Sequence, residues 1–123
     1  MVRGIRGATT VQANTVADIT KETYVLVNEM IAKNKLKPEM VAHVLFTVTA
    51  DLNEAFPAKV LRELNGWEYV PVVCAQEIPV PESLPLCVRV LMTVNTDQSQ
   101  SDIDHIYLND AVKLRPDLSL TNK

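Results

Sequence analysis

Arg89 stands out because it lies in the middle of an apolar run of β-branched and other large side chains, residues 87–94. A continuous run of this kind predicts a β-strand that is covered on both faces. A guanidinium cannot give up its charge, so a buried one needs an anion or a hydrated cavity beside it. Two interpretations follow from these residues alone: a structural ion pair, or an anion-binding site in a pocket.

Arg6 is a second candidate for binding an anion. It lies between Gly4 and Gly7 in the first predicted strand, residues 2–11. Glycine within a strand indicates a bulge, or a place where another backbone or a ligand comes close. The alternative interpretation of Arg6 is a solvated arginine on an exposed strand face.

Glu77 and Tyr107 add a carboxylate and a phenol to this set. Glu77 ends a third predicted strand, residues 67–77, which we expect to lie beside the strand of Arg89. Its carboxylate then either pairs with the arginine or lines a ligand pocket. Tyr107 lies in a short predicted strand, residues 105–108. Such residues bind and orient a small polyanion, and fixed positive charge catalyses a reaction where negative charge develops.

Other kinds of active site find no support in the sequence. There is no nucleophile with a base at recognisable spacing and no glycine loop of the phosphate-binding type. Cys74 and Cys87 form no C-x-x-C pair, and the two histidines are separated from them in the chain. We therefore expect no metal site and no cofactor, and we interpret Cys74 as an inert buried thiol.

The order of predicted elements indicates an α/β or α+β fold. It is a mixed sheet of about five strands with two helices on one face. The strands are expected at residues 2–11, 41–49, 67–77, 87–94 and 105–108, the last extended by 111–114, and the helices at residues 14–33 and 56–64. Such a sheet leaves one face open, and oligomerisation is the simplest way to bury that face.

Length and charge limit the remaining possibilities. A chain of 123 residues predicts one domain, residues 1–123, with a mobile tail from about residue 116. Twelve basic and 15 acidic residues give a net charge of −3, so we expect neither nucleic acid nor an anionic membrane as partner. No leader peptide and no membrane-spanning apolar stretch is recognisable, which predicts a cytoplasmic protein.

Nearly the whole chain resembles the AroH-class monofunctional chorismate mutases. The likeness is carried by residues 3–11, 56–59, 62–64, 66–67, 69–72, 74, 76–77, 87–90, 92–94, 105–108 and 114–118. The resemblance implies a homotrimer with a pseudo α/β-barrel core and an active site between adjacent subunits. It also implies an isomerase that converts chorismate to prephenate by a Claisen rearrangement, in phenylalanine and tyrosine biosynthesis, without a cofactor or a covalent intermediate.

The same resemblance implies a role for each unusual residue. Arg89 would contact the ether oxygen that becomes negative and a substrate carboxylate, and Arg6 would bind a carboxylate. Glu77 would accept a hydrogen bond from the ring hydroxyl, and Tyr107 would donate to a carboxylate. The pocket would further include Val73, Cys74, Ala75 and Gln76, mainly through backbone; Phe56, Lys59 and Arg62 from the neighbouring subunit; and Leu114 and Arg115 in a closing segment.

Two alternatives to this function remain open at the level of sequence. The first is a RidA-like imine deaminase, another small trimeric enzyme with an arginine in a cleft between subunits. The second is a binding module that senses a metabolite and has no catalytic activity. One position also departs from the resemblance, because Val73 stands where threonine is more usual.

Overall fold

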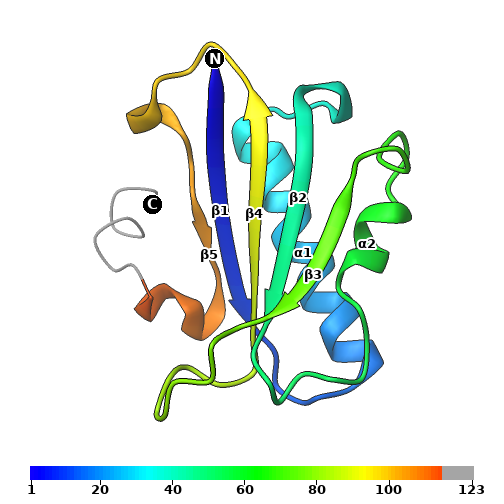
Figure 1. Cartoon of the computed structure of the whole chain (residues 1–123), viewed down its shortest axis with the longest axis vertical. Coiled ribbons are helices and arrows are strands. Elements are labelled where there is room, and N and C mark those ends of the chain that lie inside the picture. The colour runs from blue at the N-terminus through cyan, green and yellow to red at the C-terminus, as the bar shows by residue number, and fades with distance from the viewer. Residues whose placement is uncertain (115–123) are drawn as a thin grey trace.

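A mixed five-stranded sheet forms the centre of the computed structural model, which describes residues 1–114 (Figure 1). The strands are β1 (Val2–Thr10), β2 (Val41–Val48), β3 (Val72–Gln76), β4 (Cys87–Asn95) and β5 (Ile106–Tyr107). Their order across the sheet is β3-β2-β4-β1-β5. The pairs β2–β3 and β1–β5 are parallel, whereas β4 is antiparallel to both of its neighbours. The predicted fold class is confirmed.

Two α-helices lie on one side of this sheet within the described residues: α1 (Val16–Asn34) and α2 (Ala58–Arg62). The side chain of Thr15 accepts a hydrogen bond from the backbone N–H of Asp18 and caps the start of α1. The helix ends at Asn34 and is capped by Lys35, whose φ of 52° is left-handed. The buried face of α1 lies behind β1, and α2 contacts both α1 and β3. No helix in residues 1–114 is long and apolar enough to cross a membrane.

Strand β4 is fully covered on its helix face, whereas its opposite face is fully covered only at Cys87 in the single chain. Val88, Val90, Met92 and Val94 are at most 3% exposed and face the helices, whereas Leu91 on the opposite face is 39% exposed. The prediction that β4 is covered on both faces is therefore wrong for the single chain. Its continuous apolar character arises because the open face also carries apolar side chains. We call the side of the sheet away from the helices the open face.

Two predicted elements are shorter than their sequence patterns indicated. The third strand begins at Val72, because the backbone N–H of Val70 donates to the carbonyl of Trp67 and closes a turn before Pro71. The indole of Trp67 is buried in the core instead. The second helix is limited to Ala58–Arg62. Strand β3 lies at the sheet edge with β2 between it and β4, so the predicted neighbourhood of β3 and β4 is also wrong.

The chain after β5 turns into a 3₁₀ helix, η3 (Asn109–Lys113), and the prediction that residues 111–114 extend the last strand is wrong. Asn109 adopts a φ of 54°, which breaks the extended backbone. Its side-chain amide donates to the hydroxyl of Thr9 and to the carbonyl of Thr10, and so ties η3 to the end of β1. Arg115 and the predicted tail from residue 116 lie outside the described residues.

The glycines of β1 mark a close approach and no bulge. Pairing of β1 with β4 runs without a shift through both Gly4 and Gly7. A Cβ atom on Gly7 would clash with the sulfur of Met30 and lie 3.2 Å from Cδ1 of Leu26. The groups that come close to Gly7 are therefore side chains of α1, which packs tightly on this part of the sheet.

Candidate active site

The centre of the candidate site is the pair formed by Arg89 and Glu77 on the open face. Arg89 Nε lies 3.6 Å from Glu77 Oε2, and the two side chains are 29% and 26% exposed. Glu77 follows the end of β3, and its backbone N–H donates to the carbonyl of Val48 on β2. The carboxylate reaches Arg89 across β2, where Thr47 lies opposite Arg89 in the strand register. The Thr47 hydroxyl donates a hydrogen bond to Glu77 Oε2.

The Arg89 guanidinium is not satisfied by this contact. Its Nε atom is buried and has no hydrogen-bond partner in the described part of the chain. A separation of 3.6 Å gives electrostatic attraction but exceeds an ordinary N–H···O hydrogen bond. A buried donor without a partner is costly and uncommon in a purely structural role. The geometry therefore favours a site for an additional acceptor over a self-contained ion pair.

A hollow of about 320 Å³ lies over this pair and brings Arg6 into the same site. It is lined by Arg6, Gly7, Leu45, Thr47, Glu77, Arg89, Val90 and Leu91. Arg6 lies opposite Leu91, two residues along the strands from the pair of Ala8 with Arg89, and therefore on the same face of the sheet. Its backbone N–H donates to Nδ1 of His105 at 3.0 Å, which fixes the strand backbone next to the hollow. The volume suits a small polar molecule.

Tyr107 belongs to the same region, two strands away from Arg89. It pairs with Ala8 on β1, and Ala8 in turn lies opposite Arg89 on β4. The ring is buried in a small cluster with Ala8, Cys87 and Ala111, against which Leu114 packs. The Tyr107 hydroxyl is buried and has no hydrogen-bond partner among the described residues. This region thus holds a second polar group that lacks a partner.

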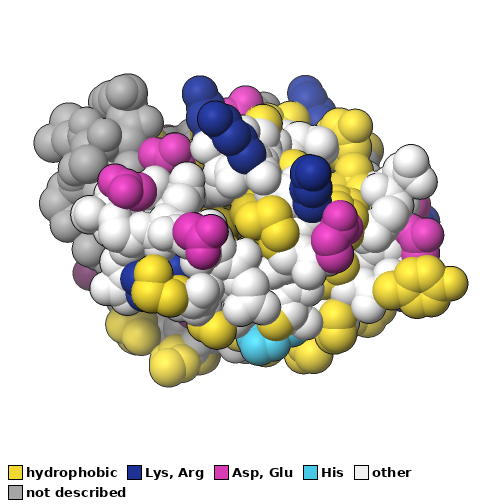
Figure 2. Space-filling model, turned by 90° about the horizontal axis from the view of Figure 1, so that it is seen from above, with side chains coloured by type: hydrophobic (Ala, Val, Ile, Leu, Met, Phe, Trp, Pro, Cys, Tyr) yellow, Lys and Arg dark blue, Asp and Glu magenta, His cyan; other side chains and the backbone are white. Residues whose placement is uncertain are grey.

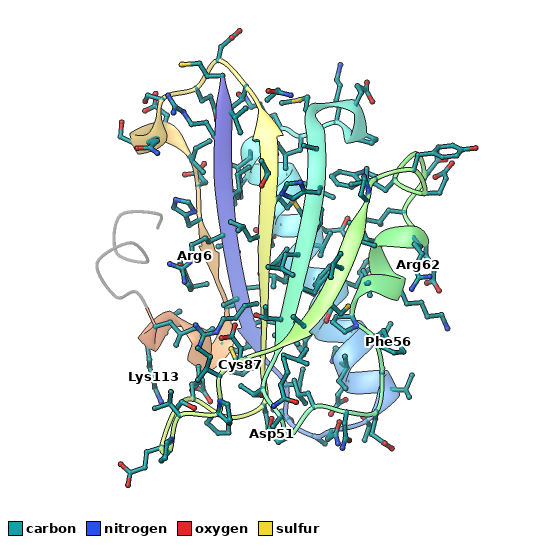
Figure 3. All side chains as sticks on the ribbon, in the orientation of Figure 1. Arg6, Asp51, Phe56, Arg62, Cys87 and Lys113 are labelled. Atoms are coloured by element: carbon teal, nitrogen blue, oxygen red, sulfur yellow. The ribbon has the colours of Figure 1, made fainter. Side chains whose placement is uncertain are left out.

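The other predicted pocket residues form a separate group at the far edge of the sheet. Phe56, Lys59 and Arg62 line a hollow of about 560 Å³ at α2. Phe56 also borders a hollow of about 390 Å³ next to residues 74–76 of β3. In Figure 3, Arg6 lies by β5 at one edge of the sheet, and Phe56 and Arg62 lie at the opposite edge. One chain therefore does not bring the two groups together.

Comparison with known proteins identifies the family. The family model described as chorismate mutase type I matches residues 2–118. The chain belongs to this family. A curated relative named Chorismate mutase AroH, from Bacillus subtilis (strain 168), is 53% identical over 121 residues, which cover 98% of this chain and 95% of the relative. A second of that name, from Thermus thermophilus, is 49% identical over 119 residues, 96% of this chain and 97% of the relative.

A solved structure agrees with the sequence comparisons. A chorismate mutase from Clostridium thermocellum matches with a TM-score of 0.85 and 49% identity, over 89% of this chain and 96% of that one. The predicted resemblance to the chorismate mutases is thereby confirmed. These comparisons give no support to the alternative of an imine deaminase.

Two predicted pocket residues of this type I chorismate mutase differ in where their side chains lie. Cys74 is paired with Phe46 in the register of β2 and β3, and it packs partly buried against the main core on the helix side. Val73 is 63% exposed and lies on the open face beside Leu45. Only the backbone of Cys74 can therefore contribute to the open face, whereas Val73 presents its side chain there.

Two residues near the pair were missed as site residues by the sequence analysis. Thr47 was recognised only as part of a strand, although the alternation of side chains along residues 41–49 would have placed it on one face with Leu45. Cys87 lies two residues before Arg89 on the same face. Burial raises the pKa of the Cys87 thiol above its ordinary value, and the nearby Arg89 opposes this rise. Cys87 therefore contributes a neutral thiol next to the guanidinium.

Proposed function

We propose that this protein converts chorismate to prephenate in the biosynthesis of phenylalanine and tyrosine, using a site centred on Arg89. The observation that carries this proposal is the buried Nε of Arg89, which lacks a hydrogen-bond partner in the described residues and borders the hollow shared with Arg6 and Glu77. Membership of the chorismate mutase family supplies the substrate. The Claisen rearrangement breaks one carbon–oxygen bond and forms one carbon–carbon bond in a single step, so it needs no proton transfer.

Arg89 would act by electrostatic stabilisation. As the carbon–oxygen bond lengthens, negative charge develops on the ether oxygen, and a fixed guanidinium beside it lowers the barrier. A preorganised donor of this kind typically contributes about 3 to 4 kcal/mol. The weak contact with Glu77 holds the guanidinium in place without satisfying it, so Arg89 needs little reorganisation when charge appears on the substrate.

The remaining groups would select the reactive conformer of the substrate. Arg6 binds one carboxylate, and the Tyr107 hydroxyl, which is buried without a partner in residues 1–114, donates to a carboxylate. Glu77 accepts a hydrogen bond from the ring hydroxyl. Holding the side chain folded over the ring converts an improbable conformer into the bound one, and this is an effect of proximity and orientation.

The site would be completed by a neighbouring subunit of a homotrimer. Phe56 is 74% exposed and lies with Arg62 at the edge of the sheet opposite to Arg6. Lys59 lines the same hollow as these two residues. Hydrophobic side chains also reach the surface among charged ones at the end of the molecule shown in Figure 2. Association would cover the open face and place Phe56, Lys59 and Arg62 of one chain over Arg89 of the next, in a pseudo α/β-barrel core. Leu114 and Arg115 would approach the same cleft.

The direct test is loss of chorismate ultraviolet absorbance with purified protein in buffer that contains a chelator, with prephenate measured as product. Rapid conversion confirms the proposal. Tight binding of chorismate without conversion would instead indicate a binding module. Absence of both would overturn the proposed function and turn attention to imine substrates.

A mixing experiment tests whether subunits share the site. Arg89→Ala and Arg62→Ala proteins are each assayed, then denatured together and refolded as mixed trimers. With shared sites, each mixed trimer regains one intact site, so an equal mixture recovers roughly a quarter of wild-type activity. A mixture no more active than the mean of its parents contradicts sharing. One variant is labelled with ¹⁵N, so that native mass spectrometry can confirm that mixed trimers have formed.

A further inference from the structure

We infer that Thr47 is a positioning residue that keeps the Glu77 carboxylate from closing on Arg89 and holds it ready for the substrate hydroxyl. The inference rests on the proposed function and deepens it by adding a residue that acts through Glu77. Thr47 lies on β2 between the strands that supply the other two residues, directly opposite Arg89 on β4 and beside Ala75 on β3.

The two carboxylate oxygens of Glu77 differ in their contacts. The Thr47 hydroxyl donates to Oε2, and Arg89 Nε faces the same oxygen at 3.6 Å. Within residues 1–114, no hydrogen bond or ion pair is recorded for Oε1. One oxygen is therefore held by the protein, and the other remains able to accept a hydrogen bond from a bound ligand.

The Thr47 hydroxyl keeps Glu77 from forming a short hydrogen bond with Arg89. A free carboxylate next to a guanidinium forms a short charge-assisted hydrogen bond, typically about 2.7 to 2.9 Å. The observed 3.6 Å is longer, and Arg89 Nε stays without a hydrogen-bond partner among the described residues. The Thr47 hydroxyl holds the same carboxylate oxygen and fixes its position. We attribute the unsatisfied state of Arg89 to this restraint on Glu77.

Removal of the Thr47 hydroxyl should change the partner of Arg89. Without the donor at Thr47, Glu77 is free to bind Nε of Arg89 directly, which satisfies the guanidinium before the substrate arrives. The transition state must then break this bond to use Arg89, so kcat falls. We expect Thr47→Val to keep the fold, because valine and threonine have nearly the same shape and Thr47 is only partly buried.

The test compares Thr47→Val with Thr47→Ser, which keeps the hydroxyl, and with Thr93→Val, which removes a hydroxyl elsewhere on the open face of β4. We expect Thr47→Val to lower kcat by about tenfold, the effect of one hydrogen bond to a charged group. Thr47→Ser should stay within about twofold of wild type, and Thr93→Val should be unchanged. In a Glu77→Ala background, Thr47→Val should cause no further loss, because the residue through which it acts is gone.

A measurement without substrate separates this inference from the proposed function. The ¹⁵N–¹H signal of Arg89 Nε, assigned by its loss in Arg89→Met, should shift in Thr47→Val as the new bond to Glu77 forms, and should stay in place in Thr47→Ser. An unshifted signal in Thr47→Val overturns the positioning role, even if wild type converts chorismate. A shifted signal supports the role even if chorismate is not the substrate.

Discussion

The two faces of strand β4 differ in how completely their side chains are satisfied. On the helix face, Val88, Val90, Met92 and Val94 are packed to at most 3% exposure. On the open face, Arg89 retains a buried Nε without a hydrogen-bond partner in the described residues. One strand thus carries stability on one side and unsatisfied polar groups on the other. Substitutions on the helix face should therefore lower stability, and substitutions on the open face should lower catalytic activity.

The largest expected effect comes from the open face. Arg89→Ala should lower kcat by at least about 1000-fold, because one preorganised donor to developing charge is typically worth 10²- to 10³-fold and we propose that Arg89 binds a carboxylate as well. Stability should change by less than about 1 kcal/mol, because the pair with Glu77 is long and partly exposed. Chorismate turnover and urea unfolding measure the two effects.

Arg3→Ala is the matched control for that experiment. Arg3 also lies on a strand, but its Nε donates to the carbonyl of Gln98, away from the hollow. We expect wild-type turnover. If Arg3→Ala and Arg89→Ala lose activity to the same degree, catalysis depends on the overall positive charge of the protein and not on the position of Arg89.

A substitution on the helix face should lower stability. Its effect in free energy should be smaller than the effect of Arg89→Ala on the activation barrier. Gly7→Ala places a methyl group against Met30 and Leu26, and overpacking of this kind typically costs 1 to 3 kcal/mol. Gly4→Ala is the comparison, because its Cβ would meet only Cδ1 of Leu91 at an ordinary 3.5 Å. Urea unfolding at one protein concentration should show a lower midpoint for Gly7→Ala alone. Equal midpoints would contradict the close packing of α1 on β1.

The smallest effect expected is a dependence of stability on pH that arises at Cys87. Burial raises the pKa of this thiol above its ordinary value of 9.0, with Arg89 acting in opposition. The unfolded chain therefore ionises first and holds fewer protons than the folded chain above that pH. This contribution to stability is complete below about pH 9 and is lost as pH rises through the folded pKa.

Substitution of each cysteine tests whether Cys87 causes stability to fall as pH rises. Unfolding free energies measured at several pH values from about 8 to 10 should fall less steeply for Cys87→Ala than for wild type. Cys74→Ala serves as the control, because it leaves the Cys87 thiol in place, and it should follow wild type. An unchanged slope in Cys87→Ala would show that other groups cause any alkaline loss of stability.

The sequence predicted the elements with strong periodicity and missed those fixed by tertiary contacts. The helix expected at residues 14–33 is observed at Val16–Asn34, because a long amphipathic pattern with a cap is a strong local signal. Trp67 has the character of a strand residue, yet the core takes its indole and the chain turns before β3. The extension at residues 111–114 failed because Asn109 adopts a left-handed φ.

The candidate site was predicted only in part, because it too depends on both local sequence and tertiary contacts. Local chemistry singled out Arg6, Glu77 and Arg89, and all three line one hollow. The insertion of β2 between β3 and β4 cannot be read from local sequence, because strand order depends on contacts far apart in the chain. Thr47 was missed for this reason, since it gains its role only from that strand order. The assignment of Phe56, Lys59 and Arg62 to a neighbouring subunit stays a prediction.

The pairing of β1 with β4 also has a consequence for the order of events during synthesis. The register joins Val2 to Asn95 and Thr10 to Cys87, so β1 cannot pair with β4 until the chain has been made as far as β4. Contacts this distant in sequence close slowly, because a long loop must be ordered before they form. The growing chain therefore emerges from the ribosome with β1 unpaired on its β4 side. Arg6 and Arg89 become neighbours only after β4 has been made.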